Sequence, residues 1–106
     1  MHTTILKEVK KNQLVVDLVD KIINADNKNR AIIENQIVNL GSTAIKTLVD
    51  ELQSVNGQIR GIVAMALIRI GKESIYELQN MARQNKELAW ISSYIISEIN
   101  LTPNAA

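Results

Sequence analysis

Apolar residues recur along most of the chain at the three- and four-residue spacing of an amphipathic helix. Between residues 12 and 24 they stand at positions i, i+1, i+4, i+5, i+8 and i+9, which gives one apolar stripe on a helix with about 3.6 residues per turn. We expect Asn12 to cap the start of this helix, because its short polar side chain can accept hydrogen bonds from the first free backbone N–H groups. The stripe consists of Leu14, Val15, Leu18, Val19, Ile22 and Ile23.

Five further apolar stripes follow, and polar or glycine-containing turns separate them. We expect Ser42 or Thr43 to cap the third helix, and the sixth helix to end before Pro103. The segment 3–10 either forms a short capping helix of its own or extends the first helix backward. No segment alternates apolar and polar residues as a half-buried strand does. The five stripes are Ile33, Ile37 and Leu40; Ile45, Leu48, Val49 and Leu52; Ile59, Val63, Ala66, Leu67 and Ile70; Ile75, Leu78 and Ala82; and Leu88, Ile91, Ile95 and Ile99.

The pattern repeats at an interval of thirty residues, which separates Gly41 from Gly71 and Arg30 from Arg60. Internal repeats of this period indicate stacked helical units. The sequence therefore predicts one domain over residues 1–106 with approximate repeats at 12–40, 41–70 and 71–101. We expect Gly41 to adopt the left-handed conformation that ends many helices. Gly61, inside the fourth stripe, is interpreted as a close helix contact.

The segment 56–71 resembles the second helix of the short HEAT-like repeat found in phycobilisome-lyase-type proteins. That helix begins with a polar cap, continues with an apolar residue, an arginine and an alanine-rich stretch, and closes with an apolar residue and glycine. The last repeat departs from this pattern at Lys86, Trp90 and Asn100. The residues that match are Asn56, Ile59, Arg60, Ala64, Ala66, Leu67, Ile70 and Gly71, and an earlier copy matches at Asp26, Arg30, Ile33, Ile37, Leu40 and Gly41.

The resemblance covers about residues 12–101, and it implies an all-α fold of the armadillo type. The expected architecture is a short right-handed α-solenoid, or α–α superhelix, of about three HEAT-like helix pairs. Stacking explains how such short helices become stable, since a single pair cannot bury its own apolar face but neighbouring pairs share one core.

The second helices of such stacks line a concave surface, and the resemblance implies that a partner protein docks there. The outward positions run i, i+4, i+7 and i+11 on two helices. Three of them, Ile32, Ile62 and Met65, either form an exposed apolar strip or are buried by packing that the pattern does not reveal. The candidate partner-binding residues are Lys28, Ile32, Asn35, Asn39, Gln58, Ile62, Met65 and Arg69.

Other polar and aromatic residues have two readings each. Asp26 with Arg30, and Asn56 with Arg60, are typical of a polar ladder that joins one repeat to the next; alternatively, one arginine binds a carboxylate of the partner. Trp90, with Tyr94 four residues later, either covers the open end of the stack or anchors a partner.

The amino-acid composition limits the kinds of reaction and binding that the chain can carry out. The 106 residues include no cysteine, which excludes disulfides, thiol catalysis and thiolate metal sites. Twelve basic and eleven acidic side chains leave a net charge of +1, too small for strong nonspecific attraction to nucleic acid or anionic lipid. The cluster of Lys7, Lys10 and Lys11 is interpreted as the solvated face of the first helix.

No motif for an enzyme, a cofactor or a metal centre is present in the sequence. His2 stands near the start of the chain without a fixed acid or base beside it, and Asp50 and Glu51 point apart on an exposed helix face. We therefore expect a non-catalytic protein–protein interaction module, a scaffold or adaptor, with no cofactor. The partner is another protein, and the open ends of the stack also allow homo-oligomers.

Two alternatives remain open. The resemblance allows an accessory subunit of a bilin-lyase-like enzyme. Nucleic-acid binding is disfavoured, because Lys28, Arg69 and Lys86 are sparse. The start of the chain lacks the features of a secretory signal, and no apolar stretch approaches twenty residues, so we expect a cytoplasmic protein.

Overall fold

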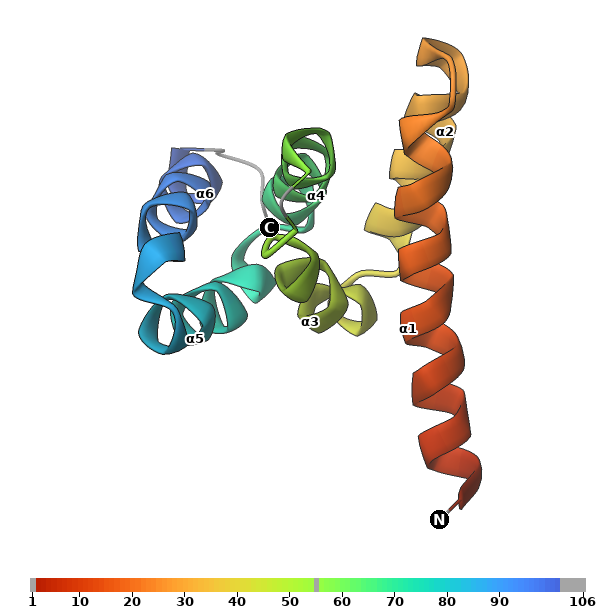
Figure 1. Cartoon of the computed structure of the whole chain (residues 1–106), viewed down its shortest axis with the longest axis horizontal. Helices are drawn as coiled ribbons and strands as arrows, with labels where there is room; N and C mark the ends of the chain where they lie inside the picture. The colour runs from red at the N-terminus through yellow and green to blue at the C-terminus, as the bar shows by residue number, and fades with distance from the viewer. Residues whose placement is uncertain (1, 55, 102–106) are drawn as a thin grey trace.

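The structure, a computed structural model, describes residues 2–54 and 56–101, with side chains from residue 12 onward. These residues form helices and turns and no strand, which confirms the all-α prediction (Figure 1). The α-helices are α1 (His2–Ile23), α2 (Asn27–Asn39), α3 (Ser42–Glu51), α4 (Gly57–Ile70), α5 (Ile75–Gln84) and α6 (Ala89–Leu101). Short 3₁₀ helices, η1 (Lys72–Ser74) and η2 (Lys86–Leu88), precede α5 and α6. None of the helices searched in the described part is long and apolar enough to cross a membrane.

Helix α1 runs without interruption from His2, so the segment 3–10 extends the first helix backward. Asn12 therefore lies inside the helix, and its predicted role as N-cap is wrong. Its Oδ1 atom instead accepts a hydrogen bond of 2.9 Å from the Thr47 hydroxyl of α3. Leu14 is 46% exposed and does not belong to the core. The side chains of His2 and of the cluster Lys7, Lys10 and Lys11 lie outside the described residues.

The α-helices are arranged as three pairs in two rows. Within each pair, α1 packs on α2, α3 on α4, and α5 on α6. Between pairs, α1, α3 and α5 contact one another in sequence and form the odd row, while α2, α4 and α6 do the same and form the even row (Figure 1). Among the described residues, no extensive contact joins the first pair to the third. Helix α4 lies at the centre, since it also packs on α1.

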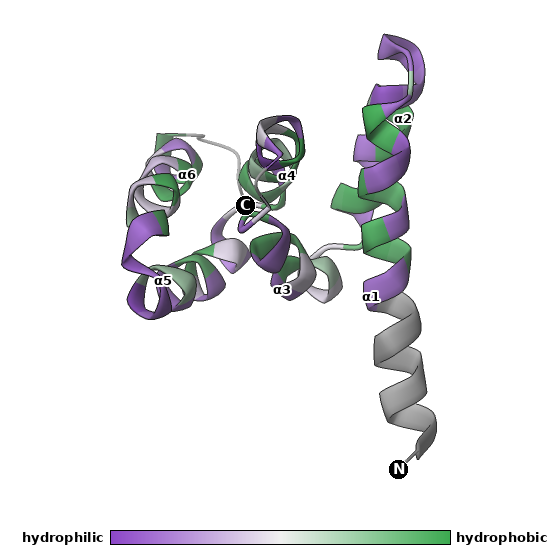
Figure 2. Ribbon diagram, viewed as in Figure 1, coloured by the Kyte–Doolittle hydropathy of each residue, from purple (hydrophilic) through white to green (hydrophobic). Residues whose placement is uncertain are grey.

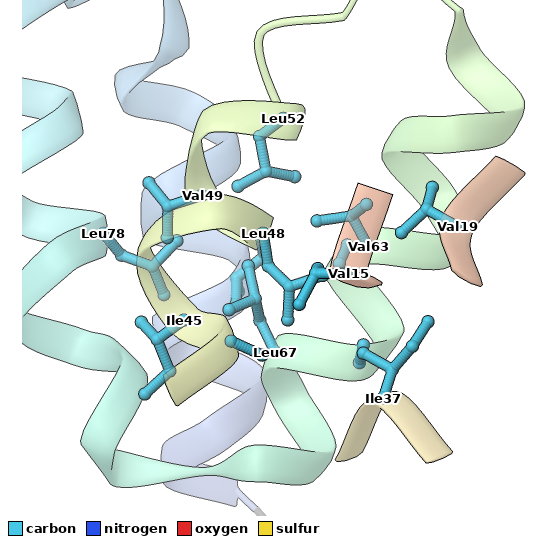
Figure 3. Close-up of a cluster of buried hydrophobic side chains, with 14 of the residues drawn as sticks. Val15, Val19, Ile37, Ile45, Leu48, Val49, Leu52, Val63, Leu67 and Leu78 are labelled. Atoms are coloured by element: carbon cyan, nitrogen blue, oxygen red, sulfur yellow. The ribbon is translucent and has the colours of Figure 1, made fainter. Parts of the chain in front are cut away.

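One hydrophobic core draws side chains from all six α-helices. Figure 3 shows Leu48 of α3 and Leu67 of α4 pointing toward Val15 of α1, with Ile37 of α2 close by. Hydrophilic residues cover the outer side of α5, away from the other helices (Figure 2). The predicted core of α3 and α6 is confirmed, because every member is buried: Ile45, Leu48, Val49, Leu52, Leu88, Ile91, Ile95 and Ile99.

The core differs from the prediction in α5. Met81 is 5% exposed and belongs to the core, whereas Ala82 is only half-buried. Met81 follows Leu78 by three residues and so lies on the same helix face. Its long flexible side chain reaches the core, which alanine at position 82 does not.

Local signals set the helix boundaries much as expected. Asp26 caps α2 by accepting a hydrogen bond from the backbone N–H of Asn29, and Asn56 caps α4 by accepting from Gln58 and Ile59. The expected cap of α3 is wrong, since neither Ser42 nor Thr43 caps it through its side chain. The Thr43 hydroxyl donates back to the carbonyl of Leu40 at 2.7 Å.

Gly41 and Gly71 occupy the two equivalent helix ends, and both have positive φ values, 58° and 93°. Their ψ values, −134° and −147°, differ from the ordinary left-handed helical conformation that we expected at Gly41. This region of backbone space is close to one that only glycine occupies readily. The chain direction therefore changes sharply between α2 and α3, and again between α4 and η1.

The two repeated arginines do not form a ladder between repeats. Arg30 Nε donates to the carbonyl of Ala25 at 3.1 Å, just beyond the end of α1. Arg60 Nε donates to the carbonyl of Leu52 at 3.2 Å, at the end of α3. Carbonyls at a helix C-terminus lack hydrogen-bond donors within the helix and carry partial negative charge. A guanidinium both donates a hydrogen bond to such a carbonyl and brings a compensating positive charge. Each arginine thus closes the turn within its own helix pair.

Candidate docking surface

The structure places the predicted partner-binding residues on neighbouring helices of the even row. All four positions on α2 are exposed: Lys28, Ile32, Asn35 and Asn39. On α4, Gln58, Met65 and Arg69 are exposed, whereas Ile62 is half-buried and packs against the core. The prediction that Ile62 belongs to an exposed strip is therefore wrong, because the packing of α4 covers it in part.

Ile32 and Met65 are the apolar part of this surface. The side chain of Ile32 is 48% exposed and that of Met65 is 53% exposed. The alternative in which they are buried by unrecognised packing does not apply to these two residues. They remain in contact with water because they lie opposite the core-facing stripes of α2 and α4.

Arg69 joins the two helices. Its Nη2 atom donates a hydrogen bond of 2.7 Å to Asn35 Oδ1, and its Nη1 atom lies 3.3 Å from Glu34 Oε1. Asn35 and Arg69 are thus brought together as predicted members of one surface. Glu34 was not among the candidates, although its position one residue before Asn35 places it beside the same guanidinium. An exposed pair of this kind adds little stability and mainly orients the arginine side chain.

Helix α6 continues the even row beyond α4 and carries three large exposed side chains. Trp90 is 64% exposed, Tyr94 is 55% exposed and Leu101 is 72% exposed. The first two were predicted to cover an end of the stack or to anchor a partner, and Leu101 was not singled out. With more than half of each side chain in water, they contribute little to the core of this chain.

Large exposed apolar side chains gather on one row of helices. Within the described part of the chain, the even row has five of them: Ile32, Met65, Trp90, Tyr94 and Leu101. The odd row has two, Leu14 on α1 and Tyr76 on α5. Single exposed apolar residues are ordinary on protein surfaces, so the feature that distinguishes the even row is the number of them on its adjacent helices.

The odd row is polar by contrast. A depression of about 490 Å³ lies between α3 and α5, where amide, carboxylate and lysine side chains form most of its wall. Asp50, which lines it, is exposed, whereas Glu51 is half-buried, so the expectation that both lie on an exposed helix face is wrong for Glu51. Burial raises the pKa of the Glu51 carboxyl above its ordinary value of 4.5, and the negative charges of Asp20 and Asp50 raise it further. The depression is lined by Lys46, Val49, Asp50, Gln53, Glu77, Asn80, Met81, Gln84 and Asn85.

Within the part of the chain that the structure describes, no three histidine or acidic side chains come together in a way that could hold a metal ion. Comparisons of the chain with protein-family models, with curated proteins and with solved structures return no match. The chemistry and exposure of its own surface are therefore the basis on which its function is assigned.

Proposed function

We propose that this chain is a non-catalytic HEAT-like repeat module that binds another protein through the even row of its helices. In this proposal the three helix pairs form a short right-handed α-solenoid, and α2 and α4 line its concave side. Three repeated local features support a repeat origin. They are the N-caps at Asp26 and Asn56, the turn-closing arginines Arg30 and Arg60, and the positive-φ glycines Gly41 and Gly71.

The observation that carries the proposal is the exposure of Ile32 and Met65 on adjacent helices. Both side chains keep about half of their surface in water although the core of the same helices is fully buried. The outward positions of the same two helices also carry two exposed amides and one oriented guanidinium, those of Asn35, Gln58 and Arg69. An apolar centre with a polar rim is the usual composition of a protein-binding site.

The test introduces a negative charge at apolar positions of similar exposure on the two rows of helices. Ile32→Glu and Met65→Glu should each abolish capture of the partner in a pull-down from the native source followed by mass spectrometry. Leu14→Glu is the matched control, because Leu14 is similarly exposed, at 46%, but lies on α1 in the odd row. Circular dichroism should show the same helix content in all three variants.

Two results would count against this surface. If the variants at Ile32 and Met65 capture the same proteins as the wild type, α2 and α4 do not form the docking site. If Leu14→Glu loses the partner and the other two do not, binding occurs through the odd row.

A further inference from the structure

The spacing between equivalent residues is not the same from α4 to α6 as from α2 to α4. This difference changes which positions of α4 correspond to the exposed residues of α6. Val63 and Leu67 of α4 follow Ile33 and Ile37 of α2 by thirty residues, but Ile95 and Ile99 of α6 follow Val63 and Leu67 by thirty-two. Five of these side chains, at positions 37, 63, 67, 95 and 99, are fully buried, and Ile33 is half-buried. The buried residues, together with the starts of α4 at Gly57 and of α6 at Ala89, support an offset of thirty-two between the second and third repeats.

With this offset, Trp90, Tyr94 and Leu101 take the places of Gln58, Ile62 and Arg69. An offset of thirty would instead match Trp90 with Arg60, and it is with this offset that Trp90 departs from the HEAT-like pattern. The three residues of α6 lie on one stripe, at i, i+4 and i+11, on the side of the helix opposite the buried Ile99. Because α6 packs beside α4 in the even row, the matched register gives this stripe the outward positions on α6 that Gln58, Ile62 and Arg69 have on α4.

The charge of the combined surface changes along the row. The outward positions of α2 and α4 include two cations, Lys28 and Arg69, and no anion, while the α6 stripe of Trp90, Tyr94 and Leu101 has no charge. The carboxylate of Glu34, also on α2, contacts Arg69. On the odd row the acidic residues include Asp17, Asp20, Asp50 and Glu77.

We propose that the docking surface extends across α6 and holds a protein segment that is apolar at one end and acidic at the other. This inference rests on the proposed function and adds the chemistry of the partner to it. The apolar end of the segment packs on Trp90, Tyr94 and Leu101, where large exposed aromatic and aliphatic side chains gain most from losing water. The acidic end lies over α2, where Lys28 provides the complementary charge.

The experiment selects ligands without assuming a partner. A random peptide library is panned against the immobilised full chain, and the enriched peptides are synthesised with a fluorescent label. Their affinities are measured by anisotropy for the wild type and for Trp90→Ser, Leu101→Ser and Lys28→Gln. Tyr76→Ser is the matched control, because Tyr76 is 65% exposed but lies on α5 in the odd row.

The enriched peptides should combine apolar residues with aspartate or glutamate. Trp90→Ser and Leu101→Ser should each weaken binding by about tenfold or more, as expected for anchor residues. Lys28→Gln should weaken binding less and reduce its dependence on salt, and Tyr76→Ser should change nothing. Trp90 is the only tryptophan, so its emission should shift to shorter wavelength when a peptide covers it.

The opposing results separate this inference from the proposed function. Peptides whose binding depends on Ile32 and Met65 but not on Trp90 or Leu101 would overturn the extension across α6 and leave the proposed function standing. Enriched peptides that are basic would overturn the charge assignment. If no peptide binding depends on any residue of the even row, both proposals fail. A dimer in sedimentation, with Trp90 emission shifted as the chain concentration rises, would show that a second copy covers this surface instead.

Discussion

The sequence predicts a close helix contact at Gly61, and the structure shows open space there instead. It lies inside α4, and a Cβ atom added there would have no neighbouring atom within 4 Å, so the close helix contact predicted for it is wrong. We expect Gly61→Ala to stabilise the fold by about 0.5 to 1 kcal/mol, because alanine loses less backbone freedom on folding than glycine does. Urea denaturation measures this difference.

The same substitution at Gly41 should lower the stability of the fold instead of raising it. A Cβ atom at this position also meets nothing within 4 Å, so space does not decide the outcome. The backbone does, because φ is 58° and ψ is −134°, a conformation that alanine resists. Gly41→Ala should destabilise the fold by about 1 to 3 kcal/mol in the same assay. Equal effects at Gly41 and Gly61 would show that conformational strain at the α2–α3 turn is not significant.

At the scale of the helix pair, Arg60 is expected to act through the end of α3. Arg60→Ala removes the donor to the Leu52 carbonyl and should cost about 1 to 2 kcal/mol, since the site is part-buried and water replaces some of the bond. Arg83→Ala is the control, because Arg83 is exposed and bonds only to Asn80 in its own helix among the contacts found. A loss at Arg83 as large as at Arg60 would contradict the turn-closing role.

The elements themselves were largely predictable from the sequence, because amphipathic periodicity and polar caps are local signals. Leu48 and Ile95 could be assigned to the core from spacing alone, and Asp26 and Asn56 could be identified as polar positions before helices. The partners of Arg30 and Arg60 could not, since a recurring arginine does not reveal which distant carbonyl it meets. The thirty-two-residue offset of α6 was also hidden, because η2 adds a turn before the helix and shifts the register that Gly41 and Gly71 suggest.

For the candidate surface, spacing identified the exposed Ile32 and Met65 but misjudged Ile62. The exposure of a residue at the edge of a helix stripe depends on how closely the next helix approaches, and that distance is set by the whole packing arrangement. Leu101 was overlooked for a related reason. Leu101 is at the end of the last helix, and no later repeat has an equivalent residue from which its exposure could be predicted.

Charge at the scale of the whole molecule gives a pH-dependent prediction. Burial and the charges of Asp20 and Asp50 raise the pKa of Glu51, so folding favours its protonated form. The contribution of this carboxyl is therefore most favourable well below pH 4.5 and is lost as pH rises through the raised pKa. Glu51→Gln should be more stable than the wild type near pH 7, with the gain shrinking at about pH 3. Urea midpoints at both pH values test this, and a gain that grows on acidification would contradict it.

The shared core predicts that the three helix pairs unfold together although each contacts only its neighbours. Leu67 lies in the central helix α4, is fully buried, and belongs to one hydrophobic cluster that includes residues of every α-helix. Leu67→Ala should cost about 2 to 5 kcal/mol by leaving a cavity. Because the pairs share this cluster, hydrogen exchange should accelerate in α2 and α5 as well as in α4. Leu14→Ala, at an exposed position, should have a much smaller effect. Faster exchange confined to α4 would instead mean that each pair is stable by itself, and that neighbouring pairs contribute little to one another's core.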